Sequence, residues 1–346
     1  MNPDHAAIFE PLAIDSLQLK NRIVMPPMVT LMGLDTERAG AYYEERAKGG
    51  VGTIILEATG IARLRSAEFV AALRVLAERL HRHGAAVVIQ LFQSDVSPTG
   101  DRFAPSPADG AREATTDEVL DSIEGFGAAA AAAREAGLDG AEIHGAHGFF
   151  LNQFFSPVTN RRSDEFGGSR EGRMQFGLRA VRAARAAAGD DWPLFYRHTA
   201  AQFESGGYSL ADTLAFAPRL VNASVSVIDI SPSTSPAPEG AASPPVHADL
   251  AAAVKGAVDV PVIAVGGMDD PDAAAAALRE GKCDLVAIGR GLLAEPLWAS
   301  KVAEGRLDQI IACTKCDEKC FGHLSQGIPI GCAENPRTGF EHEAAS

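Results

Sequence analysis

Hydrophobic positions along the chain fall into short, nearly continuous runs that are separated by longer stretches suited to helices. Continuous apolar runs are typical of strands in a parallel sheet, because both faces of such a sheet are covered by helices. Most of the runs carry few polar side chains. They predict strands at residues 22–25, 53–58, 86–91, 140–144, 193–198, 227–231, 260–267 and 285–290.

The stretches between these runs are rich in Ala, Leu and Arg, and most are long enough for helices. The clearest helical stretches are residues 67–84, 125–137, 172–189 and 269–281. The last one starts with Asp270, a natural N-cap, and Pro271, which suits the first helical turn. Eight strands that alternate with helices predict an α/β fold, a (β/α)8 TIM barrel, because a doubly wound sheet rarely needs eight β/α units in a row.

Two irregular stretches interrupt this alternation. Residues 92–115 are rich in Ser, Pro, Asp and Gly, and residues 231–246 are rich in Pro, Ser and Ala. Each stretch follows a predicted strand, so both are expected at the C-terminal mouth of the barrel, where this fold builds its active sites. A flexible surface loop is the alternative interpretation of both.

Composition and charge exclude several classes of protein. The 346 residues are 46% hydrophobic and 22% charged, as in globular rather than disordered proteins. No apolar run approaches the ~18 residues of a membrane span, and the N-terminus lacks the features of a secretion signal, so we expect a cytoplasmic protein. The net charge of −14 would repel nucleic acid.

Cysteine is scarce but clustered near the C-terminus. Four of the five cysteines have the spacing Cys313-x2-Cys316-x3-Cys320-x11-Cys332. Four thiolates at this spacing can close a tetrahedral zinc site or hold a 4Fe–4S cluster. The chemistry of the residues alone leaves both occupants open.

Glycine and polar residues stand at the ends of several predicted strands. Gly266-Gly267 and Gly289-Arg290 follow the seventh and eighth strands, where glycines and a cation often bind a phosphate in this fold. Tight strand-to-helix turns are the alternative. Gln90 and Arg197 end the third and fifth strands. The guanidinium of Arg197 needs an anionic or carbonyl partner, which is either a ligand or Glu142 on the neighbouring strand. Gln90 either contacts a ligand or is a buried amide with hydrogen-bond partners inside the protein.

His144 and His147 close the fourth strand in the sequence IHGAHG. At this spacing the two side chains would point to opposite faces of a continuing strand, so they converge only if the chain turns at Gly145 and Gly148. A zinc site, a pair of donors that holds a substrate oxygen, and a structural histidine pair all remain open from these residues.

Together these segments resemble the old yellow enzyme family of FMN-dependent NADH:flavin oxidoreductases. The resemblance extends from IFEPLAIDSLQLKNRIVMPPM through GLDGAEIHGAHGFFLNQFFSPVTNRRSDEFGGS to LVAIGRGLLAEP. The cysteine spacing, followed by Asn335-Pro336, is similar to the iron–sulfur branch with 2,4-dienoyl-CoA reductase and trimethylamine dehydrogenase, which favours a 4Fe–4S cluster over zinc. From the barrel segments and the cysteine spacing we expect an FMN-binding barrel at residues 1–305 and a cluster-binding extension at residues 306–346. Larger members of that branch continue into nucleotide-binding domains.

The resemblance implies roles for the residues at the barrel mouth. His144 and His147 would hold a substrate carbonyl or nitro oxygen while flavin N5 delivers hydride to an activated C=C bond. Arg197 would lie beside flavin N1 and O2. The expected FMN contacts are Pro26, Pro27, Ala58, Gln90, Arg197, Gly266, Gly267, Gly289 and Arg290, and the expected cluster ligands are Cys313, Cys316, Cys320 and Cys332.

One departure from the family bears directly on the chemistry. The family usually has a proton-donating Tyr two positions after the second histidine, and Phe149 has no proton to give. The sequence predicts an ene-reductase-like, FMN-dependent oxidoreductase of a small molecule, with NADH or NADPH as electron donor. One alternative is a subunit that exchanges electrons with a separate electron-transfer protein through the cluster. Another is a non-catalytic barrel with a zinc-stapled tail. A homo-oligomer is the common state of such enzymes.

Overall fold

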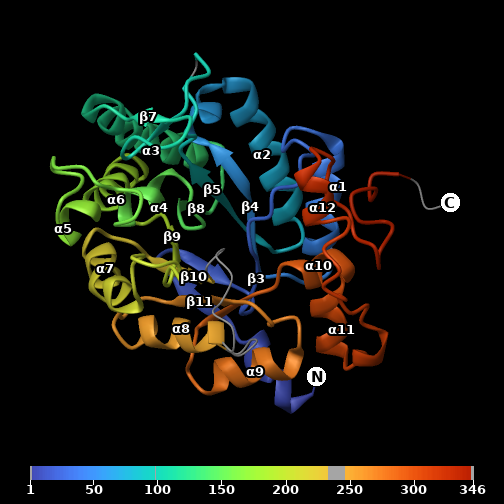
Figure 1. The fold of residues 1–346 in the computed structure, drawn as a ribbon. Helices are drawn as coiled ribbons and strands as arrows, with labels where there is room; N and C mark the ends of the chain where they lie inside the picture. The colour runs from blue at the N-terminus through green and yellow to red at the C-terminus, as the bar shows by residue number, and fades with distance from the viewer. Residues whose placement is uncertain (1, 98, 233–245, 344–346) are drawn as a thin grey trace.

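Eight parallel strands close into a barrel at the centre of the molecule (Figure 1), in the order β10-β11-β12-β3-β4-β5-β8-β9. The computed structural model describes residues 2–97, 99–232 and 246–343. The barrel strands are β3 (Ile23–Met25), β4 (Thr53–Gly60), β5 (Ala86–Phe92), β8 (Gly140–Gly145), β9 (Leu194–Thr199), β10 (Val227–Ser231), β11 (Val262–Val265) and β12 (Leu285–Ala287). Each coincides with one of the eight predicted strands, so the predicted (β/α)8 fold is confirmed.

Helices surround the barrel and follow its strands along the chain. The α-helices are α1 (Glu37–Lys48), α2 (Ala67–His81), α3 (Thr116–Glu135), α4 (Phe150–Phe155), α5 (Arg170–Arg173), α6 (Gln175–Ala188), α7 (Leu210–Asn222), α8 (Val246–Lys255), α9 (Pro271–Arg279), α10 (Arg290–Ala294), α11 (Trp298–Glu304) and α12 (Phe321–Ser325). The predicted cap of α9 is confirmed, because the Asp270 side chain accepts a hydrogen bond from the backbone N–H of Asp272. Helix α3 begins earlier than predicted, since Thr115 and Glu118 form a capping box.

Several short elements escaped prediction because segments of two to seven residues are too short to show a hydrophobic period. A hairpin of β1 (Leu12–Ile14) and β2 (Leu17–Leu19) precedes the barrel, and β6 (Phe103–Ala104) pairs with β7 (Arg112–Glu113) inside the stretch 92–115. The 3-10 helices are η1 (Pro3–Phe9), η2 (Ile61–Arg65) and η3 (Leu307–Gln309). The second predicted mouth loop, 231–246, lies almost wholly outside the described residues.

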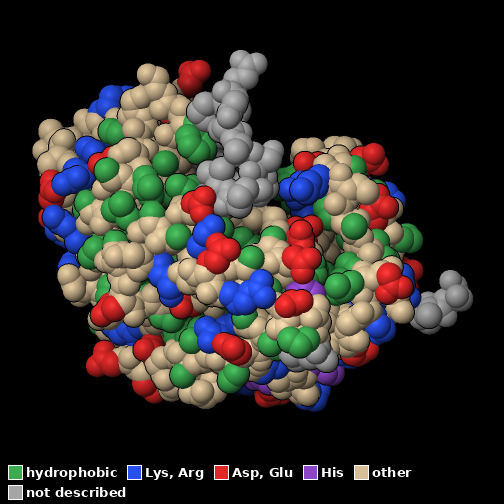
Figure 2. All heavy atoms as spheres, turned by 90° about the horizontal axis from the view of Figure 1, so that it is seen from below, with side chains coloured by type: hydrophobic (Ala, Val, Ile, Leu, Met, Phe, Trp, Pro, Cys, Tyr) green, Lys and Arg blue, Asp and Glu red, His purple; other side chains and the backbone are tan. Residues whose placement is uncertain are grey.

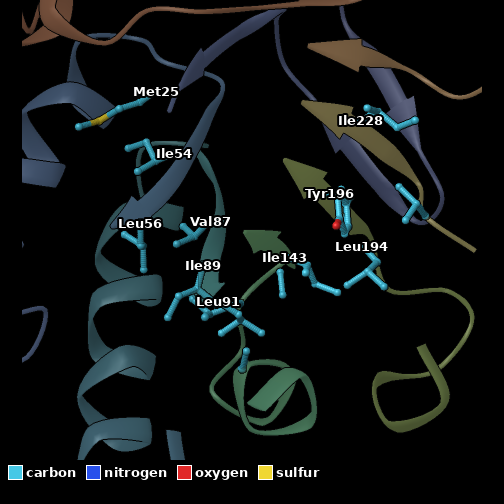
Figure 3. Packing of buried hydrophobic residues seen from close by; sticks show 14 of the residues in the cluster. Met25, Ile54, Leu56, Val87, Ile89, Leu91, Ile143, Leu194, Tyr196 and Ile228 are labelled. Carbon is cyan, nitrogen blue, oxygen red and sulfur yellow. The ribbon is translucent and has the colours of Figure 1, made fainter. Parts of the chain in front are cut away.

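The strand side chains divide into two hydrophobic clusters, one on each side of the barrel wall. Ile54 and Leu56 of β4 belong to the larger cluster between strands and helices (Figure 3), whereas Ile55 belongs to a smaller cluster inside the barrel. Successive strand side chains point to opposite faces, which explains the alternation. The interior cluster also contains Ile14 and Leu19 of the hairpin, together with residues from the N-terminal parts of the strands. The hairpin therefore closes the N-terminal end of the barrel.

The C-terminal segment packs beside α1 and α10 (Figure 1) and is held there by buried polar contacts. The fully buried Arg46 of α1 forms an ion pair with Glu341, with 2.5 Å between Nη1 and Oε1. Thr338 Oγ1 donates to the carbonyl oxygen of Leu293 at 2.6 Å. The backbone N–H of Ile330 donates to the carbonyl oxygen of Thr30 at 2.9 Å. The segment is thus tied to the barrel, and the boundary at residue 305 stays a prediction.

Charged side chains are mixed on the face that Figure 2 shows, with Lys and Arg interspersed among Asp and Glu. Among the helices that the structure describes, none is long and apolar enough to cross a membrane. The cytoplasmic location, the exclusion of nucleic acid and the oligomeric state remain predictions.

Candidate active site at the mouth of the barrel

Polar side chains occupy the barrel interior directly above the apolar layer. Gln90, Glu142, Arg197 and Asp229 lie on the adjacent strands β5, β8, β9 and β10, and all four are buried. Strand pairing sets Gln90 opposite Glu142, and Arg197 opposite Asp229. Phe195 lies two residues before Arg197, and Val227 two residues before Asp229, and both belong to the interior cluster. Strand side chains two positions apart point to the same face, so Arg197 and Asp229 point inward as well.

This polar layer places two carboxyl groups around a single guanidinium, out of contact with water. Arg197 Nε lies 3.2 Å from Asp229 Oδ2, and Gln90 Nε2 donates to Glu142 Oε1 at 2.8 Å. The ion-pair partner of Arg197 is thus Asp229 rather than Glu142, the partner considered from the sequence. Burial, and then the charge of Asp229, raise the pKa of Glu142 well above its usual range, and burial also raises the pKa of Asp229. One positive charge cannot balance two buried negative charges, so one carboxyl group stays protonated.

His144 and His147 converge above this layer, with ring centroids 5.2 Å apart and planes at 77°. The turn that brings them together uses left-handed backbone at His147 and Gly148, where φ is 61° and 73°. Gly145 serves a different purpose, because a Cβ there would lie 2.2 Å from the hydroxyl oxygen of Tyr196. Left-handed backbone at a non-glycine residue is strained and clusters at functional sites.

The imidazole of His144 is buried, that of His147 is half-buried, and both are neutral. Burial, and then the charge of Arg197, lower the pKa of His147 to about 3. Burial, and then the neighbouring His147 and Arg197, lower the pKa of His144 well below its usual range. The Nδ1 atom of His144 is buried and has no hydrogen-bond partner within the described residues. Buried polar atoms normally have a partner, so this atom is suited to meet a polar group of a ligand.

Phe149 lies over His144 at the mouth, with 4.6 Å between the ring centroids. Phe92, at the end of β5, contacts Phe149 from the other side at 5.8 Å between centroids. A cavity of about 460 Å³ opens beside His147 and is lined by polar groups that include Thr199 and Gln202. Residues of the stretch 92–115 line the same cavity, which confirms the predicted place of this stretch at the barrel mouth.

The glycines predicted to bind a phosphate lie at the ends of β11 and β12. Gly266 and Gly267 have φ values of 110° and 74°, a backbone conformation that residues with side chains avoid. A Cβ at Gly289 would lie 3.6 Å from Pro26 and 3.5 Å from Met28, so the ends of β12 and β3 approach each other here. The structure therefore brings Gly289, a predicted phosphate contact, close to Pro26, a predicted contact of the ring system.

Two further predicted flavin contacts belong to the first two barrel strands, one just after β3 and one within β4. Pro27 directly follows Pro26, and Ala58 lies in β4 where the ladder to β5 is interrupted between Leu56 and Thr59. Such a bulge bends the strand and re-aims its residues. Arg290 is engaged elsewhere, because its Nη1 donates to Asp317 Oδ1 at 2.6 Å. Its predicted contact with a phosphate stays a prediction.

The four clustered cysteines lie together in space. Cys313, Cys316, Cys320 and Cys332 line one cavity of about 20 Å³, which Arg290 also borders. All four are free thiols. Across residues 2–97, 99–232 and 246–343, no three or more His, Cys, Asp or Glu side chains are arranged around a single metal position. The grouping inferred from the sequence therefore exists, and its role in binding a metal stays a prediction.

Sequence reasoning missed two residues of the site, Asp229 and Ser231 on β10. Ser231 Oγ lies 2.6 Å from His147 Nε2 and 3.3 Å from Arg197 Nη2. The signal was present in the sequence VIDIS, where two polar residues alternate with apolar ones at the C-terminal end of a barrel strand. Such positions face the interior just below the mouth.

The sequence signature of the NADH:flavin oxidoreductase / NADH oxidase family matches residues 7–309. The chain belongs to this family. An NADH oxidase of Thermoanaerobacter brockii is 36% identical over 367 residues, which cover 96% of this chain and 56% of that protein. An NADPH dehydrogenase of Geobacillus sp. is 34% identical over 323 residues, which cover 86% of this chain and 94% of that protein.

Solved structures of the family superimpose closely on this chain. A 2-naphthoyl-CoA reductase in complex with 2-naphthoyl-CoA has a TM-score of 0.92 at 26% identity, covering 98% of this chain and 58% of that one. Morphinone reductase in complex with tetrahydroNAD has a TM-score of 0.74 at 26% identity, covering 86% and 91%. The predicted resemblance to the old yellow enzyme family is thereby confirmed. The chain spans 56% and 54% of the NADH oxidase and of a related metal reductase.

Proposed function

We propose that this chain is an FMN-dependent reductase that uses NADH or NADPH to reduce an activated C=C bond conjugated to a carbonyl group. The observation that carries this proposal is the pair of neutral imidazoles above Arg197, that of His144 buried and that of His147 half-buried. Two hydrogen-bond donors aimed at one point can stabilise the charge that develops on a carbonyl oxygen. A cinnamate reductase of Clostridium sporogenes, 30% identical to this chain, is named for a conjugated acid.

Several features of the barrel mouth support FMN as the cofactor. Gly266, Gly267 and Gly289 let backbone N–H groups approach a phosphate closely. Pro26, Pro27 and Ala58 offer small apolar surfaces to a flat ring system. When bound, FMN supplies hydride transfer between a nicotinamide nucleotide and the substrate. Gln90 and Arg197 would hydrogen-bond its polar edge, and Asp229 holds the guanidinium from below.

The histidine pair would orient the substrate and polarise it. With their N–H groups on one carbonyl oxygen, His144 and His147 draw electron density away from the conjugated C=C bond. The carbon that receives no hydride needs a proton, which Phe149 cannot donate. We propose that water in the cavity beside His147 supplies this proton, because Thr199 and Gln202 give that cavity a polar wall.

A second function is favoured by the four cysteines that line one cavity. We propose that they hold a 4Fe–4S cluster, one cysteine to each iron. Arg290 borders this cavity and follows Gly289, so the cysteine segment adjoins the proposed FMN site. In this role the chain would exchange electrons with a separate protein through the cysteine segment. About four irons per chain in anaerobically purified protein would support the cluster, and about one zinc without iron would refute it.

Anaerobic reduction of the bound flavin tests the first function. FMN-loaded protein is mixed with NADH or NADPH, the loss of flavin absorbance is followed, and a cyclic enone is then added. We expect one nucleotide to bleach the flavin and the enone to restore its absorbance. In His147→Ala the second step should slow, while the control His81→Gln, on α2 and paired with Asp139, should behave as wild type. Rapid nucleotide oxidation with no response to conjugated carbonyl compounds would refute this function.

A further inference from the structure

We infer that Ser231 is a positioning residue that holds His147 in the tautomer with its proton on Nδ1, so that this imidazole donates a hydrogen bond toward the barrel mouth. The consequence of this inference for catalysis rests on the proposed function. The geometry behind the inference does not, because all of the groups involved belong to this chain and are described by the structure.

The hydrogen bonds of Ser231 fix the direction of its hydroxyl proton. Arg197 carries only donors, so at 3.3 Å from Nη2 the Ser231 oxygen must accept. The hydroxyl proton then needs an acceptor, and among the described residues the other partner of this oxygen is His147 Nε2 at 2.6 Å. If His147 donated instead, the buried hydroxyl proton would be left without a partner, an arrangement that costs about 1–3 kcal/mol.

One ring nitrogen and the backbone of His147 are both held in place, so the tautomer decides what the other ring nitrogen offers. Its backbone N–H donates to Thr199 Oγ1 at 3.0 Å, and its left-handed backbone, with φ of 61°, sets the direction of the side chain. The neutral ring carries one N–H group and one lone pair. With Nε2 accepting from Ser231, the N–H group is at Nδ1, the ring atom that this hydrogen bond leaves free.

The three residues thus form a directed chain of donors from Arg197 through Ser231 to His147. Each hydrogen bond in such a chain polarises the next one. Without the serine hydroxyl, the other tautomer of His147 becomes accessible, and it would present a lone pair to the substrate oxygen. In metal sites, removing the residue that orients a ligating histidine typically costs about 10–100-fold in metal affinity or activity. By analogy, we expect Ser231→Ala to lower enone turnover by about this factor.

The tautomer can be measured directly by NMR on FMN-loaded protein labelled with ¹⁵N-histidine. We expect the His147 ring to show a protonated Nδ1 and an unprotonated Nε2, with the signal assigned by its loss in His147→Gln. Ser231→Thr keeps a hydroxyl and should keep this pattern, whereas Ser231→Ala should give a mixture of tautomers. The control Ser122→Ala removes another buried hydroxyl, which donates to Glu118 in α3 at 2.7 Å, and should leave the pattern unchanged.

The possible outcomes separate this inference from the proposed function. A wild-type His147 protonated at Nε2 would overturn the inference, as would an unchanged tautomer in Ser231→Ala. The wild-type spectrum alone is decisive if the alanine variant does not fold. If the expected tautomer is present and depends on the hydroxyl while no enone is reduced, the inference stands and the proposed function fails.

Discussion

The buried ion pair between Arg46 and Glu341 ties the C-terminal segment to the barrel, and neutralising the carboxylate should destabilise the fold. The Arg46 side chain is fully buried and that of Glu341 is 4% exposed. Glu341→Gln keeps the shape of the side chain but removes its charge. Arg46 would keep its hydrogen bonds to the carbonyl oxygens of Tyr42, at 2.7 Å, and Leu292, at 3.1 Å.

The expected loss of folding stability depends on these remaining hydrogen bonds of the guanidinium. Removing one partner of a buried ion pair costs about 3–5 kcal/mol, because the other charge is left uncompensated. The two carbonyl oxygens supply partial compensation, which puts Glu341→Gln near 3 kcal/mol, the lower end of that range. With a urea m-value of about 3 kcal/mol per M, the unfolding midpoint should fall by about 1 M.

Urea unfolding followed by circular dichroism measures this shift, and Asp35→Asn provides the matched control. Asp35 pairs with Arg63 at 3.0 Å, but the two side chains are 44% and 47% exposed, so water screens the pair. Exposed pairs contribute at most about 1 kcal/mol, which corresponds to about 0.3 M. Equal shifts in the two variants would refute the reasoning that burial decides the cost.

Three other predictions test the site and its electrostatics. Phe149→Tyr adds a hydroxyl where the family has its proton donor and should raise cyclic-enone turnover by a substantial part of the ~10²–10⁴-fold that a general acid contributes; fast wild-type turnover that the tyrosine does not improve would contradict this. Cys316→Ser should reduce the brown iron–sulfur absorbance, and Cys283→Ser, buried apart from the cluster, should not; equal loss in both would contradict the ligand assignment. Burial lowers the pKa of His198 in the folded chain to about 4, whereas a histidine in the unfolded chain has a pKa of about 6.5. Between about pH 6.5 and pH 4 the unfolded chain therefore binds one more proton than the folded chain, and stability falls as the pH is lowered through this range. His198→Gln should remove about 1.4 kcal/mol per pH unit from that slope in urea titrations, and an unchanged slope would exclude His198 as its source.

The barrel could be predicted because its strands are buried on both sides and appear as uninterrupted apolar runs. The ends of the strands were less predictable, since backbone conformation decides them. The run at 260–267 gives a strand only over β11 (Val262–Val265), because the positive φ of Gly266 and Gly267 ends the pairing. The start of α3 had a sequence signal in Thr115 and Glu118, whose capping box extends the helix beyond its alanine-rich part.

The candidate site was predictable where neighbouring residues carry the chemistry and unpredictable where partners come from different strands. The IHGAHG sequence places His144 and His147 within one turn, and the cysteine spacing is visible in the tail. The bond from Ser231 to His147 joins positions 84 residues apart, and that from Arg290 to Asp317 joins positions 27 residues apart. Such contacts depend on strand register and on loop paths, which apolar periodicity does not encode.

The order of layers inside the barrel explains how the mouth combines neutral donors with a nearby positive charge. Hydrophobic residues at the N-terminal end exclude water, so the polar layer above them must nearly balance its own charge. Arg197 with Asp229 and a protonated carboxyl group at Glu142 or Asp229 achieves this balance. The same guanidinium helps to keep both imidazoles neutral, because it disfavours a second positive charge nearby. Negative charge that develops at the mouth therefore meets hydrogen-bond donors first and the positive Arg197 just below, an arrangement suited to stabilising an anion without holding one permanently.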